Sequence, residues 1–188
     1  RHGDSRYEDF LDVLMSLRYG ESLCGYASRI HYFTDWIAQN HTRGWVRDIQ
    51  GPNPPFKAVQ TIDLWFMSRN ADKYLMLRRH PEFVPEIRRQ EEIYKGRMFR
   101  YIPKSAVVNS PSVRQAVHDG DIIAITTNTP GLDIAHVGFA VWKKDGLHLL
   151  NASQTHKKVV EETMTLRTYL DRHKSFTGFR VARIRNMN

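Results

Sequence analysis

The sequence predicts an α+β fold in which a mainly helical N-terminal half packs on an antiparallel β-sheet in the C-terminal half. Three observations lead to this prediction. Apolar residues recur at helical spacing in residues 7–19. Residues 118–153 contain three short runs of β-branched and aromatic residues, bounded by Gly, Asp and Asn, as in successive antiparallel strands. The side chains of residues 178–184 follow the period of two that is expected of a strand, in which successive side chains point to opposite faces.

The N-terminal half predicts four helices and one irregular segment. We expect helices over residues 7–19 and 27–40, because apolar side chains gather on one face of each. Residues 44–69 predict a loop followed by extended chain. Further helices are expected over 70–79 and 82–96, the second with Glu and Arg on a solvated face.

The C-terminal half predicts a sheet of consecutive hairpins. Residues 143–146 contain Lys-Asp-Gly, a good tight turn because Asp and Gly tolerate positive φ. The strands on either side of this turn are expected to be neighbours. The other expected elements are an extended segment at 101–104, short helices at 112–117 and 164–173, and an edge strand at 159–160.

Composition places the chain among soluble globular proteins. Its 188 residues suit a single domain with a real core, and 41% hydrophobic with 26% charged residues fits that class. No apolar run approaches the roughly 20 residues of a membrane helix. The net charge of +8 favours anionic partners such as nucleic acid, acidic lipid or cell wall, or it is general solvated basicity.

Cysteine and histidine usage predicts no metal and no cofactor. Cys24 is the only cysteine, which excludes an intrachain disulfide and a zinc site built from several cysteines. The nine histidines never fall at metal-ligand spacing on one element. No glycine-rich phosphate loop is present.

His136 and Asn151 are the residues that point most directly to chemistry. His136 opens one predicted strand and Asn151 lies in the next. If the strands pair, the imidazole and the amide face each other across one ladder spacing. A base at a strand start, oriented by a polar partner on the neighbouring strand, is the geometry that cysteine-nucleophile hydrolases need. The alternative for Asn151 is a solvated edge-strand residue.

The same residues resemble a known family. Residues 120–123 (Gly-Asp-Ile-Ile), 136–139 (His-Val-Gly-Phe) and 150–153 (Leu-Asn-Ala-Ser) resemble the NlpC-type branch of papain-like cysteine peptidases, which cleave bacterial cell-wall peptides. The run Gly-Tyr-Ala-Ser-Arg-Ile-His-Tyr-Phe-Thr-Asp-Trp-Ile at 25–37 is more specific. With Gly-Leu-Asp at 131–133, it resembles the N-acetylmuramoyl-L-alanine amidase-like proteins.

The resemblance implies a papain-like fold and a Cys, His and polar third residue as the catalytic set. His136 matches the histidine, and Asn151 takes the third position, where the sub-branch more often has His. The family's cysteine belongs to a helix that precedes the start of this chain. We therefore expect residues 1–188 to be one amidase-like domain without the N-terminal segment that carries the nucleophile.

Cys24 is the alternative nucleophile. It precedes the predicted helix at 27–40, whose N-terminus would favour a thiolate. The motif places it in a loop after the nucleophile helix, which favours an incidental thiol.

Four further residues are predicted to bind substrate. Arg29 is suited to hold a substrate carboxylate or carbonyl with its forked donors, and Tyr26 to place its hydroxyl near the reacting carbonyl. Ser28 lies with Arg29 in the first turn of the helix predicted at 27–40, and Asp133 lies in the loop before His136. The structural alternatives are core packing for Tyr26, a solvated first helical turn for Ser28 and Arg29, and an ordinary turn for Asp133.

The resulting hypothesis is a muropeptide amidase that cleaves the bond between N-acetylmuramic acid and L-alanine. Its partners would be peptidoglycan fragments, and its location the periplasm or cell envelope, as the family implies. A non-catalytic cell-wall binding module of the same fold stays open. A basic nucleic-acid binder is a weaker alternative, because basic and aromatic residues do not form a recognition motif.

Overall fold

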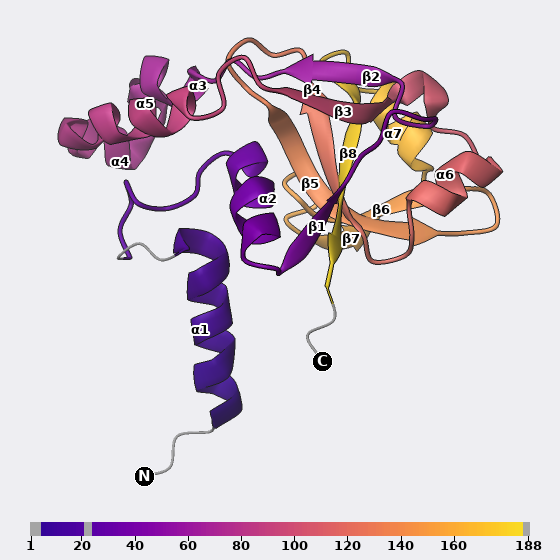
Figure 1. Ribbon diagram of the computed structural model, residues 1–188, viewed down its shortest axis with the longest axis horizontal. Helices are drawn as coiled ribbons and strands as arrows, with labels where there is room; N and C mark the ends of the chain where they lie inside the picture. The colour runs from indigo at the N-terminus through magenta and orange to yellow at the C-terminus, as the bar shows by residue number, and fades with distance from the viewer. Residues whose placement is uncertain (1–4, 21–23, 186–188) are drawn as a thin grey trace.

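The computed structural model describes residues 5–20 and 24–185. Helices and strands are interspersed along the chain, and Figure 1 shows α3, α4 and α5 gathered at one end and α6 and α7 at the other. The elements are α1 (Ser5–Tyr19), α2 (Phe33–Thr42), β1 (Val46–Ile49), β2 (Ala58–Thr61), α3 (Phe66–Arg69), α4 (Leu75–Arg79), α5 (Val84–Glu92), β3 (Met98–Pro103), α6 (Pro111–Ala116), β4 (Ile122–Thr127), β5 (Ile134–Trp142), β6 (Leu147–Ser153), β7 (Lys158–Glu161), α7 (Leu166–Asp171) and β8 (Phe176–Ile184), with 3-10 turns Ala71–Lys73, Pro81–Phe83 and Lys104–Ala106.

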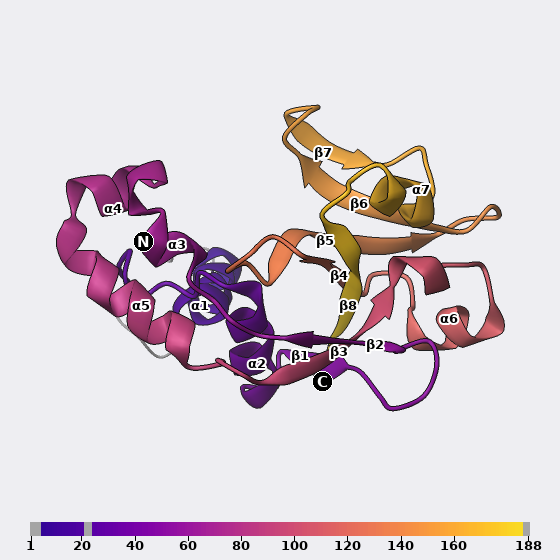
Figure 2. The same cartoon turned by 90° about the horizontal axis from the view of Figure 1, so that it is seen from above.

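One antiparallel sheet holds the strands together. Its order is β2-β3-β8-β4-β5-β6-β7, and β1 pairs with β8 beyond the end of the β3 pairing. The sheet is strongly curled when seen from above (Figure 2). The three consecutive strands predicted from residues 118–153 are β4, β5 and β6, paired in that order. The structure is thus mixed α and β with an antiparallel sheet, as predicted.

The predicted division into a helical and a sheet half is too simple. β1, β2 and β3 come from the first 103 residues, and they complete one side of the sheet. The expected alternation in 178–184 is also wrong. Residues 178–182 are all buried, because β8 lies in the middle of the sheet and both of its faces are covered.

The helix expected at 27–40 begins later, at Phe33. In the residues that precede α2, side chains form hydrogen bonds with backbone carbonyl oxygens. The Ser28 hydroxyl donates to the Gly25 carbonyl at 3.2 Å, and Nε2 of His31 lies 2.7 Å from the Tyr26 carbonyl oxygen. Such local side-chain bonds compete with helix formation, so residues 24–32 turn instead.

The hairpin from β5 to β6 positions the candidate site. Lys143 and Gly146 close the predicted turn, with Lys143 N donating to Gly146 O at 2.8 Å. Gly138 lets the strands approach, since a Cβ there would lie 2.6 Å from the Leu150 carbonyl oxygen. The ladder pairs Phe139 with Leu150, so Asn151 follows directly on the partner strand.

Apolar clusters cover both faces of the sheet. The largest contains Ile123, Ile125 and Leu149 and includes residues of α6 and α7. A second joins α2 to the opposite face through Ile37 and Ala124. A third lies among the helices α3 to α5, and its buried members are Tyr32, Ile62, Leu64, Met67, Leu77, Ile87 and Tyr94.

Not every charge on the predicted helix at 82–96 is solvated. Glu91 is buried, and its Oε1 accepts from the Tyr32 hydroxyl at 2.7 Å and from Ser68 N at 3.0 Å. These bonds tie α5 to the residue before α2 and to α3.

In the part of the chain that the structure describes, no helix has the length and hydropathy needed to cross a bilayer.

Candidate active site

His136 and Asn151 meet as their strand positions predict. Nε2 of His136 lies 2.9 Å from Oδ1 of Asn151. Asn151 is buried, whereas His136 is partly exposed. An amide oxygen only accepts hydrogen bonds, so Nε2 carries the hydrogen and Nδ1 is left with a lone pair.

An open pocket of about 400 Å³ lies against His136. Of the predicted binding residues, Tyr26, Arg29 and Asp133 line it. Ser28 instead lines a neighbouring hollow with Arg29. The other residues around the pocket come from the turn before α2, from the α3–α4 region and from the start of β5: His31, Tyr32, Phe33, Met67, Tyr74, Leu132, Ile134, Ala135 and Val137.

Asp133 ties the loop before His136 to helix α2. Its buried Oδ2 accepts a 2.7 Å hydrogen bond from Thr34 N, in the first turn of that helix. Its carbonyl oxygen accepts from Nε2 of Gln60 at 2.7 Å. A carboxylate at a helix N-terminus satisfies an unpaired N–H and complements the helix dipole. Asp133 therefore fixes where β5 begins and where His136 stands.

The buried side chain of Arg180 also contacts Thr34, the residue whose N–H donates to Asp133. Arg180 donates from Nη1 to the Thr34 hydroxyl at 2.9 Å and from Nη2 to Oδ2 of Asp48 at 3.2 Å, with its guanidinium over the Phe99 ring. Burial lowers the pKa of Arg180, while the carboxylates of Asp48 and Asp133 oppose this shift. The start of α2 is thus held by charged groups on two sides.

Arg29 presents a cation at the pocket. Its side chain is exposed, and no ion pair or side-chain hydrogen bond joins it to another of the residues that the structure describes. Burial raises the pKa of the Tyr26 hydroxyl beside it above 10.0, and the charge of Arg29 partly offsets this. At neutral pH the pocket therefore offers a guanidinium and a protonated phenol, both hydrogen-bond donors.

His31 packs beneath these two residues and stays neutral at pH 7. Its ring lies 4.8 Å from that of Tyr26, centroid to centroid. Burial lowers the pKa of His31 below 6.5; the bond to the Tyr26 carbonyl opposes the shift and the charge of Arg29 adds to it.

We expect His31 to make the fold sensitive to mild acid. Because its folded-state pKa is lowered, its contribution to stability is complete above about pH 6.5 and is lost as the pH falls through the folded value. Between pH 7 and pH 5, the unfolding free energy of the wild type should fall more than that of His31→Gln, which keeps a donor for the Tyr26 carbonyl. Urea unfolding at each pH measures this, and parallel pH dependences would contradict it.

Cys24 lies apart from this constellation. It is an exposed free cysteine and is not among the residues that line the pocket with His136. It stands in a bend, and the helix expected to follow it starts only at Phe33. The helix dipole that would have favoured its thiolate is therefore not next to it.

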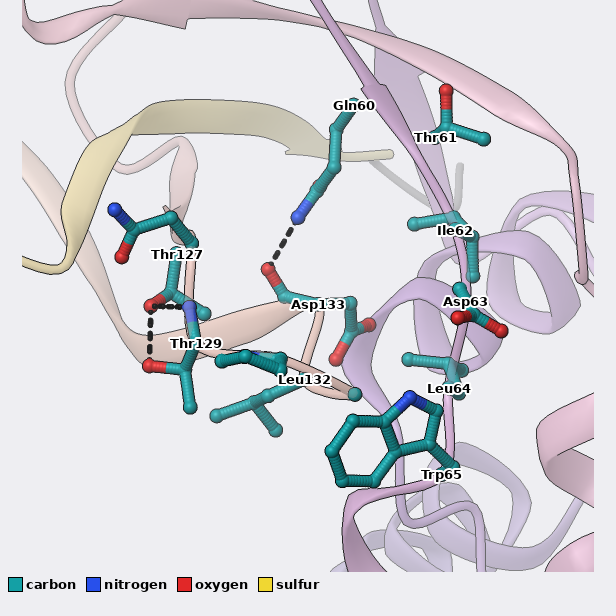
Figure 3. Close-up of a pocket in the computed structure, with 13 residues that line it drawn as sticks. Gln60, Thr61, Ile62, Asp63, Leu64, Trp65, Thr127, Thr129, Leu132 and Asp133 are labelled. Carbon is teal, nitrogen blue, oxygen red and sulfur yellow. Dashed lines mark hydrogen bonds between the residues drawn. The ribbon is translucent and has the colours of Figure 1, made fainter.

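A second pocket, of about 340 Å³, shares Leu132 and Asp133 with the first. In Figure 3, Thr127 and Thr129 lie on one side of Asp133 and Trp65 on the other. Trp65 packs on Gly131, where a Cβ would lie 2.4 Å from the indole ring. This close packing fixes the loop that separates the two pockets.

A residue that the sequence did not predict is hydrogen-bonded to Asn151. Glu162 follows β7, is buried, and its Oε1 accepts from Nδ2 of Asn151 at 2.9 Å. No spacing or motif marks it, because it lies just past the end of β7, for which the sequence predicts only an edge strand at 159–160. Within residues 5–20 and 24–185, no group of three or more His, Cys, Asp or Glu side chains is arranged to hold a metal ion.

An imidazole held by a buried amide at the wall of an open pocket is typical of hydrolases that use a general base. Residues 2–178 match the model of the N-acetylmuramoyl-L-alanine amidase-like family. The chain therefore belongs to that family.

Solved structures show the same relationship. An N-acetylmuramoyl-L-alanine amidase from Bacteroides uniformis is 36% identical with a TM-score of 0.87, covering 95% of this chain and 74% of that one. A Bacteroides fragilis protein, described provisionally as a xylanase, is 38% identical with a TM-score of 0.85, covering 94% and 76%. A Legionella pneumophila protein at 22% identity and a TM-score of 0.66, covering 95% and 70%, shares the fold. Among curated proteins, no relative matches.

Proposed function

We propose that this protein is a cell-wall amidase that hydrolyses the amide between N-acetylmuramic acid and L-alanine, using a cysteine nucleophile in a papain-like (NlpC-type) arrangement. The contact that carries the proposal is Nε2 of His136 at 2.9 Å from Oδ1 of Asn151, beside an open pocket. Membership of the amidase-like family supports the bond type. The substrate class implies work in the bacterial cell envelope.

The reaction would proceed through an acyl-enzyme. Nδ1 of His136 takes the thiol proton, and the thiolate attacks the lactyl carbonyl to form a C–S bond. The C–N bond then breaks as the imidazolium gives its proton to the leaving amine of L-alanine. Water, activated by the same ring, hydrolyses the thioester. Asn151 holds the imidazole in the required tautomer throughout.

Two side chains at the pocket would serve the substrate. The protonated hydroxyl of Tyr26 is a donor for the developing oxyanion, an interaction worth roughly 3–4 kcal/mol when well placed. Arg29 would hold a carboxylate of the peptide stem. Asp133 would act through the backbone, because its buried Oδ2 already accepts from Thr34 N. Ser28, which lines the neighbouring hollow, would contact only a substrate extending beyond the main pocket.

We further propose that the attacking thiolate comes from a residue that precedes Arg1 in the encoded protein. The position of Cys24 supports this, since it is exposed in a bend and outside the pocket lining. Cys24→Ser in the full-length protein should then leave turnover unchanged. A Cys24→Ser protein that binds muropeptide but no longer cleaves it would assign the nucleophile to Cys24.

Replacing Arg29 should weaken substrate use if it binds a carboxylate. A charge-assisted hydrogen bond contributes about 1.5–3 kcal/mol, so Arg29→Gln should lower kcat/KM roughly 10- to 100-fold, mainly through KM. Arg29→Lys should fall between, because it keeps the charge and loses the fork. Steady-state kinetics with a muropeptide and with its stem-amidated analogue measures this. Equal losses on both substrates would contradict carboxylate binding.

Product analysis tests the proposed function. Full-length protein incubated with disaccharide-peptide muropeptides should release a peptide with a free N-terminal L-alanine and an intact sugar, detected by mass spectrometry. New reducing ends, or cleavage within the peptide, would contradict the proposed bond. Binding without any cleavage would favour the alternative of a non-catalytic cell-wall module.

A further inference from the structure

Glu162 completes a chain of buried contacts behind the candidate base. Nε2 of His136, the amide of Asn151 and Oε1 of Glu162 are joined by two contacts of 2.9 Å each. Asn151 is 4% exposed and Glu162 8%, so water competes little for either contact. The backbone of both residues is held in place. Asn151 pairs with Val160 in the ladder between β6 and β7. Glu162 N donates to Leu149 O at 2.9 Å, and His148 Nδ1 lies 2.9 Å from Glu162 O.

The carboxylate decides which way the Asn151 amide faces. The two ends of an asparagine amide have nearly the same shape, so their orientation follows from their partners. An ionised carboxylate offers only acceptors and requires Nδ2. A reversed amide would bring an amide oxygen against the carboxylate oxygen of Glu162. Oδ1 is therefore left to face His136.

The amide orientation in turn decides the tautomer of His136. Oδ1 accepts only, so Nε2 must carry the one hydrogen of the neutral ring. Nδ1 keeps its lone pair and has no side-chain or backbone partner among the residues that the structure describes. A reversed amide would donate to Nε2 and favour the Nδ1–H tautomer, which cannot accept a proton at Nδ1.

We propose that Glu162 is a positioning residue that selects the proton-accepting tautomer of His136 by fixing the orientation of the Asn151 amide. This inference rests on the proposed function in one respect, that Nδ1 of His136 is the base. Glu162 is not among the residues that line the pocket, and its side chain is hydrogen-bonded to Asn151, so its effect on His136 passes through that amide.

The tautomer can be measured without substrate or nucleophile. Long-range ¹H–¹⁵N NMR spectra of the 188-residue chain above pH 7.5 distinguish the protonated from the bare ring nitrogen of His136. In the wild type the Nε2–H form should dominate, and Asn151→Ala gives the preference of the ring without its partner. A hydrogen bond that contributes about 1 kcal/mol predicts a wild-type ratio about fivefold above that of Asn151→Ala.

Glu162→Gln is the decisive variant, because glutamine is isosteric and can face the amide with either end. The tautomer ratio should fall several-fold toward the Asn151→Ala value. Glu161→Gln is the matched control, since the neighbouring Glu161 is exposed and pairs with Lys143, and it should leave the ratio unchanged. Adding Glu162→Gln to Asn151→Ala should have no further effect, because both act through one amide.

Two results would overturn the proposal. One is a wild-type protein in which the hydrogen of the His136 ring lies mainly on Nδ1. This result does not depend on whether any variant folds. The other is a folded Glu162→Gln protein, checked by its amide fingerprint spectrum, with the wild-type ratio. A protein that fails to cleave muropeptides would refute the proposed function and leave this tautomer result standing, so the two failures are distinguishable.

Discussion

His136→Ala should reduce amidase turnover of the full-length protein by roughly 10²–10⁴-fold, the usual contribution of a general acid–base group. The variant removes the acceptor of the thiol proton and the donor to the leaving amine together. Because His136 is only partly buried at the wall of an open pocket, its loss should leave the fold intact. Steady-state kinetics on muropeptides, with KM reported separately, measures the effect, which should fall on kcat.

Two comparisons make this result specific to His136. His156→Ala removes an exposed histidine from the turn between β6 and β7 and should retain wild-type turnover. Asn151→Ala should lie between the two, since the ring remains but its orientation is no longer fixed. A folded His136→Ala protein within about threefold of wild type would remove the base from the mechanism.

Arg180→Ala should cost about 3–5 kcal/mol of unfolding free energy, the range for breaking a buried ion pair by removing one partner. Arg180 is 1% exposed and is the donor to both Thr34 and Asp48. Without it, Asp48 loses its counter-ion in a largely buried position, and the start of α2 loses its support behind Asp133. Urea unfolding measures the loss, read from the midpoint at unchanged slope.

Arg167→Ala is the matched control for this prediction. Arg167 pairs with Asp171 one turn along α7, and both side chains are more than two-fifths exposed. An exposed pair of this kind contributes about 1 kcal/mol or less. If Arg180→Ala were no more destabilising than Arg167→Ala, the buried network behind the site would not support the fold as we describe.

The parts of the site that could be predicted from sequence are those set by neighbouring strands. The hairpin from β5 to β6 follows from a Lys-Asp-Gly turn and two apolar runs, and pairing then brings His136 near Asn151. Tyr26 and Arg29 were marked by the family motif at 25–37. The first expectation needed only turn chemistry and one strand pairing, whereas the second rested on the family resemblance.

The parts that could not be predicted depend on contacts between distant segments. Thr34 and Asp133 are 99 residues apart, and Thr34 and Arg180 are 146 apart. No periodicity reports such pairs. Glu91 illustrates the same limit. A glutamate on a charged helix is expected to be exposed to solvent, yet Glu91 is buried and accepts hydrogen bonds from Tyr32 and Ser68. The late start of α2 follows from side-chain bonds that propensity does not include.

Cysteine alkylation tests the central claim most directly. The full-length protein carrying Cys24→Ser is treated with iodoacetamide at pH 7, and muropeptide cleavage is followed as alkylation proceeds. We predict that turnover is lost in step with modification of one remaining cysteine, and that bound muropeptide slows that modification. Full turnover after every cysteine has been alkylated would show that no thiolate attacks the substrate, and would contradict the account.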